Sequence, residues 1–195
     1  MLHDVRRLTG ANFLMAETGA AAEATIDVSV KSFAMALWRR EARALLDAVG
    51  WKEERIAVRA FDGGATLQIS APMDALYAAT EIVEASWDAA EALLNGKDAP
   101  DRGVEAARLR DSIAAERNPA MVAIAAAAEA NGFTFLGHDG AVSVGLGHGV
   151  QVLDENDIPA INDFPWDVVK VVPGAIVDRG DVVFIEHLYA KTEPD

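Results

Sequence analysis

The stretch RIAVRAFDGGATLQIS, Arg55–Ser70, decides the fold of the first half of the chain. Apolar or small residues alternate with polar ones on either side of a central Asp-Gly-Gly: Ile56, Val58 and Ala60 before it, and Ala65, Leu67 and Ile69 after it. A period of two is typical of a strand with one buried face, and the glycines of the turn accept positive φ. The stretch therefore predicts a β-hairpin, and with it an antiparallel sheet.

Helical patterns lie on both sides of this hairpin. Upstream, from about Ser32, apolar residues recur at spacings of three and four as far as Gly50, which has the position of a left-handed helix-ending residue. The members of this stripe are Phe33, Leu37, Trp38, Ala42, Leu45, Leu46 and Val49. Downstream, a second long helix is expected to start with Ser70 as its N-cap and Pro72 in its first turn, and to end at Asn95-Gly96.

The first thirty residues predict short strands at 5–8, 12–15 and 24–28, with the stretch ETGAAAE, Glu17–Glu23, as a loop. Residues 1–96 are thus expected to form an N-terminal α+β domain in which an antiparallel sheet packs against long amphipathic helices. The polar segment 97–103, interrupted by Pro100 and Gly103, is the predicted linker.

Residues 104–195 predict a helical connection followed by a small β-rich C-terminal unit. One helix is expected over 104–117, and Asn118-Pro119 predicts the start of another that ends at Asn131-Gly132. The stretches FTFL (133–136) and AVSVGL (141–146) predict strands, as do the short runs VVKVV (168–172) and VVFIEHLY (182–189). The fold class is therefore α+β.

A glycine-rich stretch, SVGLGHGVQV, lies at 143–152. A phosphate-binding loop needs a strand before the glycines and a helix after them, because the phosphate binds free N–H groups at the start of that helix. Here the residues that follow Gly149 are strand-like, and no Gly-Lys-Ser/Thr occurs in the chain. We interpret the glycines as a tight turn or bulge, and keep as the alternative a ligand contact through Gly145, Gly147 and His148.

The composition limits the choice of partners. The 195 residues carry 17 Lys and Arg against 31 Asp and Glu, a formal charge of -14, which repels nucleic acids and anionic membranes and attracts cationic partners. The chain has no cysteine, so thiolate chemistry is excluded. With no apolar region typical of a signal peptide and no long apolar run, we expect a cytoplasmic protein without a membrane segment.

Four carboxylates share one face of the predicted helix after the hairpin: Glu81, Glu84, Asp88 and Glu91. Such a face is either a solvated acidic surface, a docking surface for guanidinium or ammonium groups, or a metal site. No histidine lies at a matching offset, and the four histidines of the chain, His3, His138, His148 and His187, have no zinc-binding spacing. We expect neither a metal nor a cofactor.

Three stretches carry a resemblance to a known family: RRLTGANFLM (6–15), the long acidic helix (70–94) and the region 116–152. Together they resemble the N-terminal region of cyanophycin synthetase and of related Mur-ligase family proteins. Ala11 stands where that family usually has proline, which is a minor departure. After PGAIV (173–177) the chain reads DRGDVVF, without the Gly-Lys-Thr motif that binds ATP in those enzymes, so the resemblance implies the fold and a role in peptide recognition but no ligase activity.

The favoured hypothesis is a non-catalytic accessory protein that binds a peptide or amino-acid polymer, with a cationic peptide or a ligase as its partner. The expected ligand contacts are Asn12, Glu81, Glu84, Asp88, Gly145, Gly147 and His148, and no catalytic residue is assigned. One alternative is an enzyme or enzyme subunit that acts on a small metabolite in a cleft between the two units, with His138 or His148 as acid or base. A structural homo-oligomer is the other.

Overall fold

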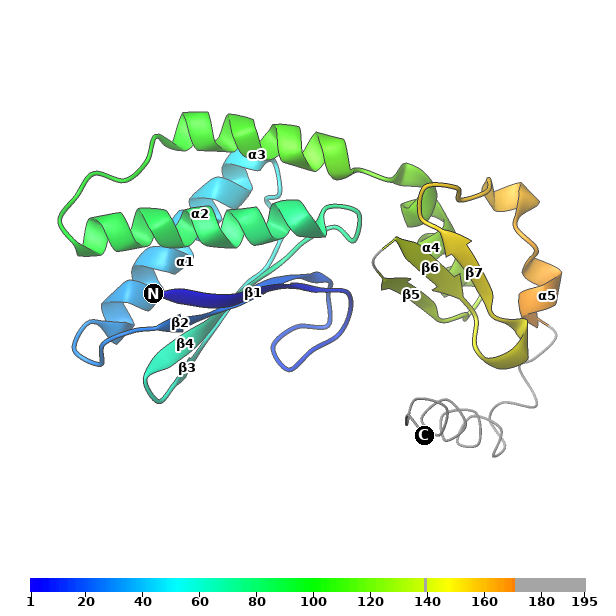
Figure 1. Ribbon diagram of the computed structural model, residues 1–195, viewed down its shortest axis with the longest axis horizontal. Coiled ribbons are helices and arrows are strands. Elements are labelled where there is room, and N and C mark those ends of the chain that lie inside the picture. Colours follow the sequence, from blue (N-terminus) through cyan, green and yellow to red (C-terminus); the bar gives the residue numbers. More distant parts are fainter. Residues whose placement is uncertain (139, 171–195) are drawn as a thin grey trace, which may run out of the picture. The chain divides into compact units, whose positions relative to one another are not determined.

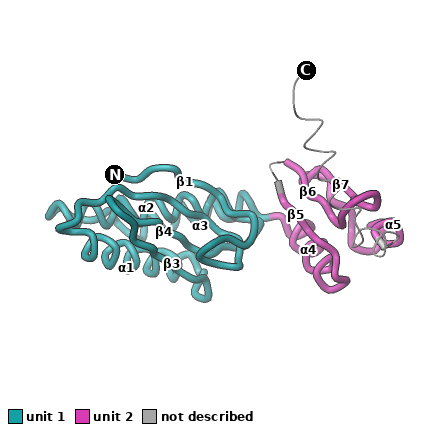
Figure 2. The backbone as a smooth tube through the Cα atoms, turned by 90° about the horizontal axis from the view of Figure 1, so that it is seen from below, with its two compact units in different colours: residues 1–117 teal, residues 118–195 magenta. Residues whose placement is uncertain are grey.

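The chain folds into two compact units, residues 1–117 and 118–195 (Figure 2). The computed structural model describes residues 1–138 and 140–170. The division between Arg117 and Asn118 lies after the segment 97–103 that the sequence predicts as the linker. It lies there because the helix that follows this segment, α3 (Arg102–Glu116), buries Leu109 in the core of the first unit and so belongs to that unit.

An antiparallel sheet forms one layer of the first unit (Figure 1). Its strands are β1 (Leu2–Leu8), β2 (Gly19–Thr25), β3 (Ile56–Phe61) and β4 (Gly64–Ser70), in the order β1-β2-β4-β3. The predicted hairpin is confirmed: β3 pairs antiparallel with β4, in a register that sets Val58 opposite Leu67. Gly63 lies in the turn with a φ of 77°, a conformation that favours glycine.

The strand predictions at the N-terminus are partly wrong. The segment 12–15 is not a strand, and the predicted loop ETGAAAE contains most of β2, which pairs with both β1 and β4. Ala20, Ala22 and Ala24 of β2 are buried in the core. Alanine has little intrinsic preference for strands, but a central strand beneath packed helices is stabilised by its burial and by its pairing on both sides.

Two helices, α1 (Lys31–Val49) and α2 (Leu76–Leu94), pack on one face of this sheet and share its apolar core (Figure 1). The indole N–H of the buried Trp38 donates to the carbonyl oxygen of Val83 at 3.3 Å and so joins the two helices. The helix-ending role of Gly50 is confirmed by its φ of 94°. Phe33, in contrast, does not belong to the buried stripe, since it is 61% exposed in the first turn of α1.

The start of α2 also differs from the prediction. Ser70 ends β4, and the helix begins only at Leu76, after an N-cap residue, Ala75, that makes no side-chain capping bond. The Ser70 hydroxyl instead accepts a hydrogen bond from the backbone N–H of Arg55 at 2.7 Å, which ties β4 to the segment before β3. Ser70, which the sequence pattern predicts as the N-cap of the helix, therefore stabilises the sheet and does not cap the helix.

The second unit is small and β-rich, as predicted. Helix α4 (Pro119–Ala130) precedes a three-stranded antiparallel sheet of β5 (Phe135–His138), β6 (Ala141–Val144) and β7 (Gln151–Asp154), in that order. Short 3-10 turns at Gly147–Gly149 and Ile161–Asp163 and a last helix, α5 (Trp166–Lys170), complete the described part. The Asn118 side chain caps α4 by accepting from the N–H of Met121 at 3.0 Å.

Residues 168–170, predicted as part of a β-like run, belong to α5 instead. The local reason lies in the residues before them, because Pro165 fixes φ at a helical value and Trp166 is anchored by its indole N–H, which donates to the Ile161 carbonyl at 2.9 Å. The run VVFIEHLY at 182–189 lies outside the described residues.

Candidate functional site

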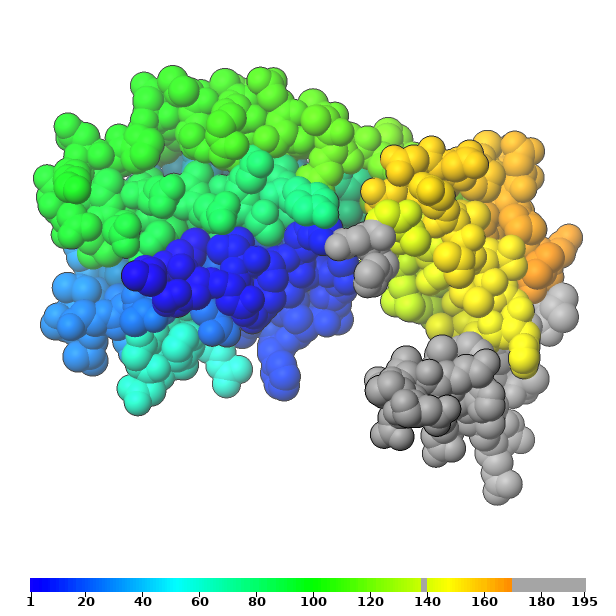
Figure 3. All heavy atoms as spheres, in the orientation of Figure 1, coloured from blue at the N-terminus to red at the C-terminus, as the bar shows by residue number. Residues whose placement is uncertain are grey.

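A groove of about 290 Å³ lies between α2 and α3 in the first unit, and Figure 3 shows the outer surfaces of these two helices side by side. Its walls combine the carboxylates of α2 with residues of α3 and of the segment before it: Glu81, Glu84, Ala85, Asp88, Pro100, Glu105 and Arg108. The carboxylates of α2 face this groove because their spacing of three and four residues sets them opposite the buried side of the helix. The structure thus brings together three of the predicted contacts.

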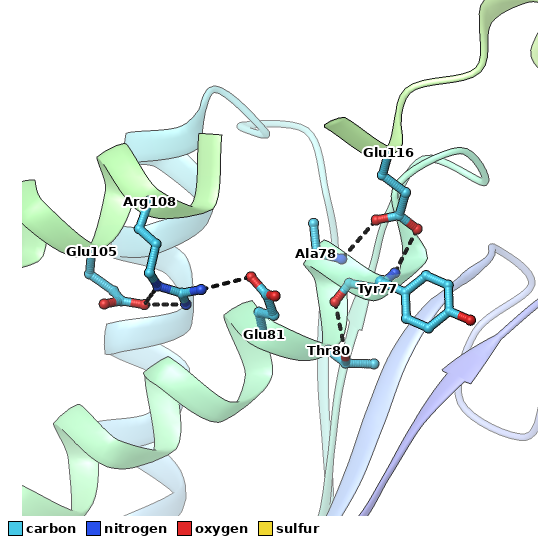
Figure 4. Close-up of polar contacts among 7 residues, drawn as sticks. All are labelled: Tyr77, Ala78, Thr80, Glu81, Glu105, Arg108 and Glu116. Atoms are coloured by element: carbon cyan, nitrogen blue, oxygen red, sulfur yellow. Dashed lines mark hydrogen bonds and ion pairs between the residues drawn. The ribbon is translucent and has the colours of Figure 1, made fainter. Parts of the chain in front are cut away.

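Arg108 is the cation that the groove already contains. Its guanidinium donates from Nη1 to Oε2 of Glu81 at 2.9 Å and from Nε to Oε1 of Glu105 at 3.0 Å, and so bridges the two helices (Figure 4). The hydrogen bond to Glu105, and then that to Glu81, raises the pKa of Arg108 above its ordinary value. Glu81 is therefore occupied by an internal partner.

Glu84 and Asp88 differ from Glu81 in this respect. Neither forms an ion pair or hydrogen bond with another side chain in the described part of the chain. Burial, together with the charges of Glu91 and Glu105, raises the pKa of Asp88 above its ordinary value. Four carboxylates against one guanidinium leave the groove with an excess of negative charge.

A smaller recess adjoins the groove and shares Ala85, Pro100 and Glu105 with it. The remaining residues of its wall are Glu41, Leu45, Ala89, Ala99 and Arg102. Alanine, leucine and proline side chains give it an apolar surface of the kind that methylene groups contact. The combined surface offers aliphatic contacts beside carboxylate acceptors.

Glu41 is the most buried carboxylate of this recess, at 4% exposed. It accepts from Nη2 of Arg40 at 2.8 Å and from Nη2 of Arg102 at 2.8 Å. Burial raises its pKa, but the hydrogen bonds from Arg102 and Arg40 outweigh burial and hold the pKa of Glu41 below its ordinary value. Arg102 belongs to α3, so this contact also joins α3 to α1.

Sequence reasoning missed Glu41, Glu105 and Arg108. A signal for Glu41 exists, since it lies three residues after Trp38 and four before Leu45, in the middle of an apolar stripe. A charge at such a position needs a partner when it is buried. Glu105 and Arg108, at i and i+3 on an exposed helix, give no comparable signal.

Asn12 is not among the residues that line the groove. Its side-chain oxygen accepts from the backbone N–H groups of Leu14 at 2.9 Å and Met15 at 3.2 Å. These bonds shape the connection between β1 and β2, at the tip of which Phe13 is 99% exposed. The structure thus gives Asn12 a local conformational role.

Gly145, Gly147 and His148 lie in the second unit, and so in a different compact unit from the α2 carboxylates. The two glycines have φ values of 86° and 67°, and the strand β7 follows them, paired antiparallel with β6. The prediction of a turn is confirmed, because the glycines reverse the chain through a short 3-10 turn at Gly147–Gly149 and a strand, not an α-helix, follows. His148 is exposed on this turn, and His138 ends β5.

Among residues 1–138 and 140–170, no three His, Asp or Glu side chains come close enough to hold a metal ion. Over the same residues no helix combines the length and the apolar character needed to cross a bilayer. Comparison with known proteins finds neither a family model nor a curated protein that matches the chain.

Proposed function

We propose that this chain is a non-catalytic binding protein whose α2–α3 groove receives a cationic side chain of a peptide or amino-acid polymer. The observation that carries the proposal is the pair Glu84 and Asp88, two carboxylates in a groove of net negative charge that pair with no other side chain among the described residues. A guanidinium or ammonium group there replaces water at both carboxylates and forms charge-assisted hydrogen bonds.

Two further features favour an organic cation over a metal ion. The groove of about 290 Å³ is far larger than a metal ion requires, and the side chains do not converge in the way that metal ligands do. The adjoining recess with Ala85, Ala89 and Ala99 suits the methylene stem of an arginine or lysine side chain. The resemblance to the N-terminal region of cyanophycin synthetase agrees with such a ligand.

Calorimetry with two peptides of equal length, one rich in arginine and one with citrulline in its place, tests the proposal. Citrulline keeps the shape of the side chain and removes its charge, so the arginine peptide is expected to bind more tightly. Glu84→Gln is expected to weaken arginine-peptide binding about three- to tenfold, since one charge-assisted bond contributes about 1 kcal/mol at a partly exposed site.

Glu53→Gln is the matched control, because Glu53 is an exposed acid of the α1–β3 connection, away from the groove, and the substitution changes the net charge by the same amount. This variant is expected to bind as the unmodified protein does. Equal affinity for the two peptides, or equal weakening by the two substitutions, would show that only the overall charge of the protein attracts the ligand.

A further inference from the structure

Helix α3 is attached to the first unit by few apolar side chains. It buries three of its 15 residues, Ala106, Leu109 and Ile113, whereas α1 buries seven of 19 and α2 nine of 19. Apolar burial is the main source of helix docking in a folded protein. The attachment of α3 therefore depends more on polar contacts than that of either neighbour.

Those polar contacts run from α3 to both helices beneath it. Arg102 reaches Glu41 of α1 at 2.8 Å, Arg108 reaches Glu81 of α2 at 2.9 Å, and Arg110 donates to the carbonyl oxygen of Ala48 at 3.1 Å. At the other end the carboxylate of Glu116 accepts from the first N–H groups of α2 (Figure 4). The Arg108–Glu81 pair joins two partly exposed charges, at 50% and 36%, and such pairs weaken as salt increases, whereas the side chain of Glu41 is 5% exposed.

Short non-helical segments separate α3 from α2 and from α4. Residues 95–101, before it, form neither helix nor strand and include Gly96, at a φ of 67°, and Pro100. After it, Arg117 pairs with the buried carboxylate of Asp74 at 2.8 Å, and the second unit begins at Asn118. Few buried apolar contacts, and ion pairs whose arginines are about half exposed, are features of a locally unfolding or undocking element.

We propose that α3, called the strap below, can undock from the first unit. Its arginines compete with the cationic ligand for the same carboxylates. Arg102 and Arg108 bind Glu41 and Glu81 through their guanidinium groups. The proposed ligand would bind carboxylates through the same kind of group. Release of α3 removes Arg102 from Glu41, which keeps Arg40, and frees Glu81, so that Glu81 joins the exposed Glu84 and Asp88 on one face of α2. A single cation binds the docked state at Glu84 and Asp88, and a polycation favours the released one. This competition rests on the proposed function; the release of α3 does not.

Hydrogen–deuterium exchange on the full chain tests both parts separately. Without ligand, amides of 102–116 are expected to exchange faster than those of β2 and β4, and roughly tenfold faster in about 500 mM than in about 20 mM NaCl. Arg108→Gln is expected to accelerate the same amides at low salt. Arg39→Gln is the matched control, because Arg39 is exposed on α1 and makes no ion pair with another described residue.

If the amides of α3 exchange as slowly as those of the sheet, and salt has no effect, the proposed release of α3 is wrong, whether or not a ligand binds. If α3 does open, an arginine-rich peptide added at low salt is expected to accelerate exchange of 102–116 further, and a citrulline peptide to leave it unchanged. Binding of the arginine peptide without acceleration overturns the competition while leaving the proposed function in place. Absence of binding overturns the proposed function and the competition together, but not the strap.

Discussion

Replacement of the buried carboxylate of Glu41 is expected to reveal how strongly α3 is held. This side chain is 4% exposed and accepts three hydrogen bonds from two guanidinium groups, from Nε of Arg40 at 2.9 Å and from Nη2 of Arg40 and of Arg102 at 2.8 Å. A hydrogen bond to a charged group contributes about 1.5–3 kcal/mol, but both arginines are more than half exposed, which reduces that figure. Glu41→Gln keeps the shape and one acceptor, so the free energy of unfolding is expected to fall by about 1–2 kcal/mol near neutral pH.

The direction in which the Glu41→Gln effect changes with pH follows from the lowered pKa of Glu41. The pKa of Glu41 is held below its ordinary value in the folded protein, so the folded state binds fewer protons than the unfolded state in that range. The stabilisation is complete above the ordinary pKa of the carboxyl group and is lost as the pH falls through the lower folded value. The difference in unfolding free energy between the unmodified protein and Glu41→Gln is therefore expected to be constant above about pH 5 and to narrow as the pH falls towards about pH 3.

Urea unfolding followed by tryptophan fluorescence measures this difference. A Trp166→Phe background removes the tryptophan of the second unit, so that Trp38, Trp51 and Trp87 report on the first unit alone. Glu53→Gln serves as the control for loss of an exposed acid. A difference that stays constant over the pH range, or that Glu53→Gln reproduces, would refute the assignment of the effect to a buried carboxylate between two arginines.

Two further substitutions test local features. The Glu116 carboxylate accepts from the N–H groups of Tyr77 and Ala78 at 2.8 and 2.9 Å, and Glu116→Gln removes its negative charge. The free energy of unfolding of the first unit is expected to fall by about 1 kcal/mol in the same urea assay. No change would show that solvent caps α2 equally well. Gly145→Ala places a Cβ at a φ of 86° and 2.8 Å from Cγ1 of Val169. The free energy of amide protection over 141–154 is therefore expected to fall by about 1–2 kcal/mol. Gly137→Ala is the control and is expected to have little effect, because the space around its Cβ is open. Equal protection in the two glycine variants would contradict the role assigned to the Gly145 turn.

Periodicity predicted those parts of the fold in which local and tertiary preferences agree. The hairpin β3–β4 has alternating apolar residues and a glycine turn, and α1 has a continuous stripe ended by Gly50, so each is specified within its own residues. The same holds for the turn at Gly145 and Gly147, where strand-like residues on both sides left only a chain reversal.

The strand β2 shows where such reasoning fails. Its alanines carry no strand signal, and its position is determined by partners distant in sequence: Leu8 faces Gly19 from one side and Ser70 faces it from the other. Gly19 is required there because a Cβ would collide with the backbone of Ile69. Constraints of this kind arise from strand pairing and helix packing, and the residues between 17 and 25 do not contain them.

The same distinction applies to the candidate site. The spacing of Glu81, Glu84 and Asp88 specifies that they share a face of α2, but it leaves open whether that face is solvated or covered. The packing of α3 decides this for Glu81, which pairs with Arg108, whereas Glu84 and Asp88 remain exposed beside the groove and pair with no described side chain. A solvated face would leave all three carboxylates equivalent. The difference between Glu81 and the other two carboxylates therefore arises from α3, which lies far from them in sequence, and the spacing on α2 does not contain it.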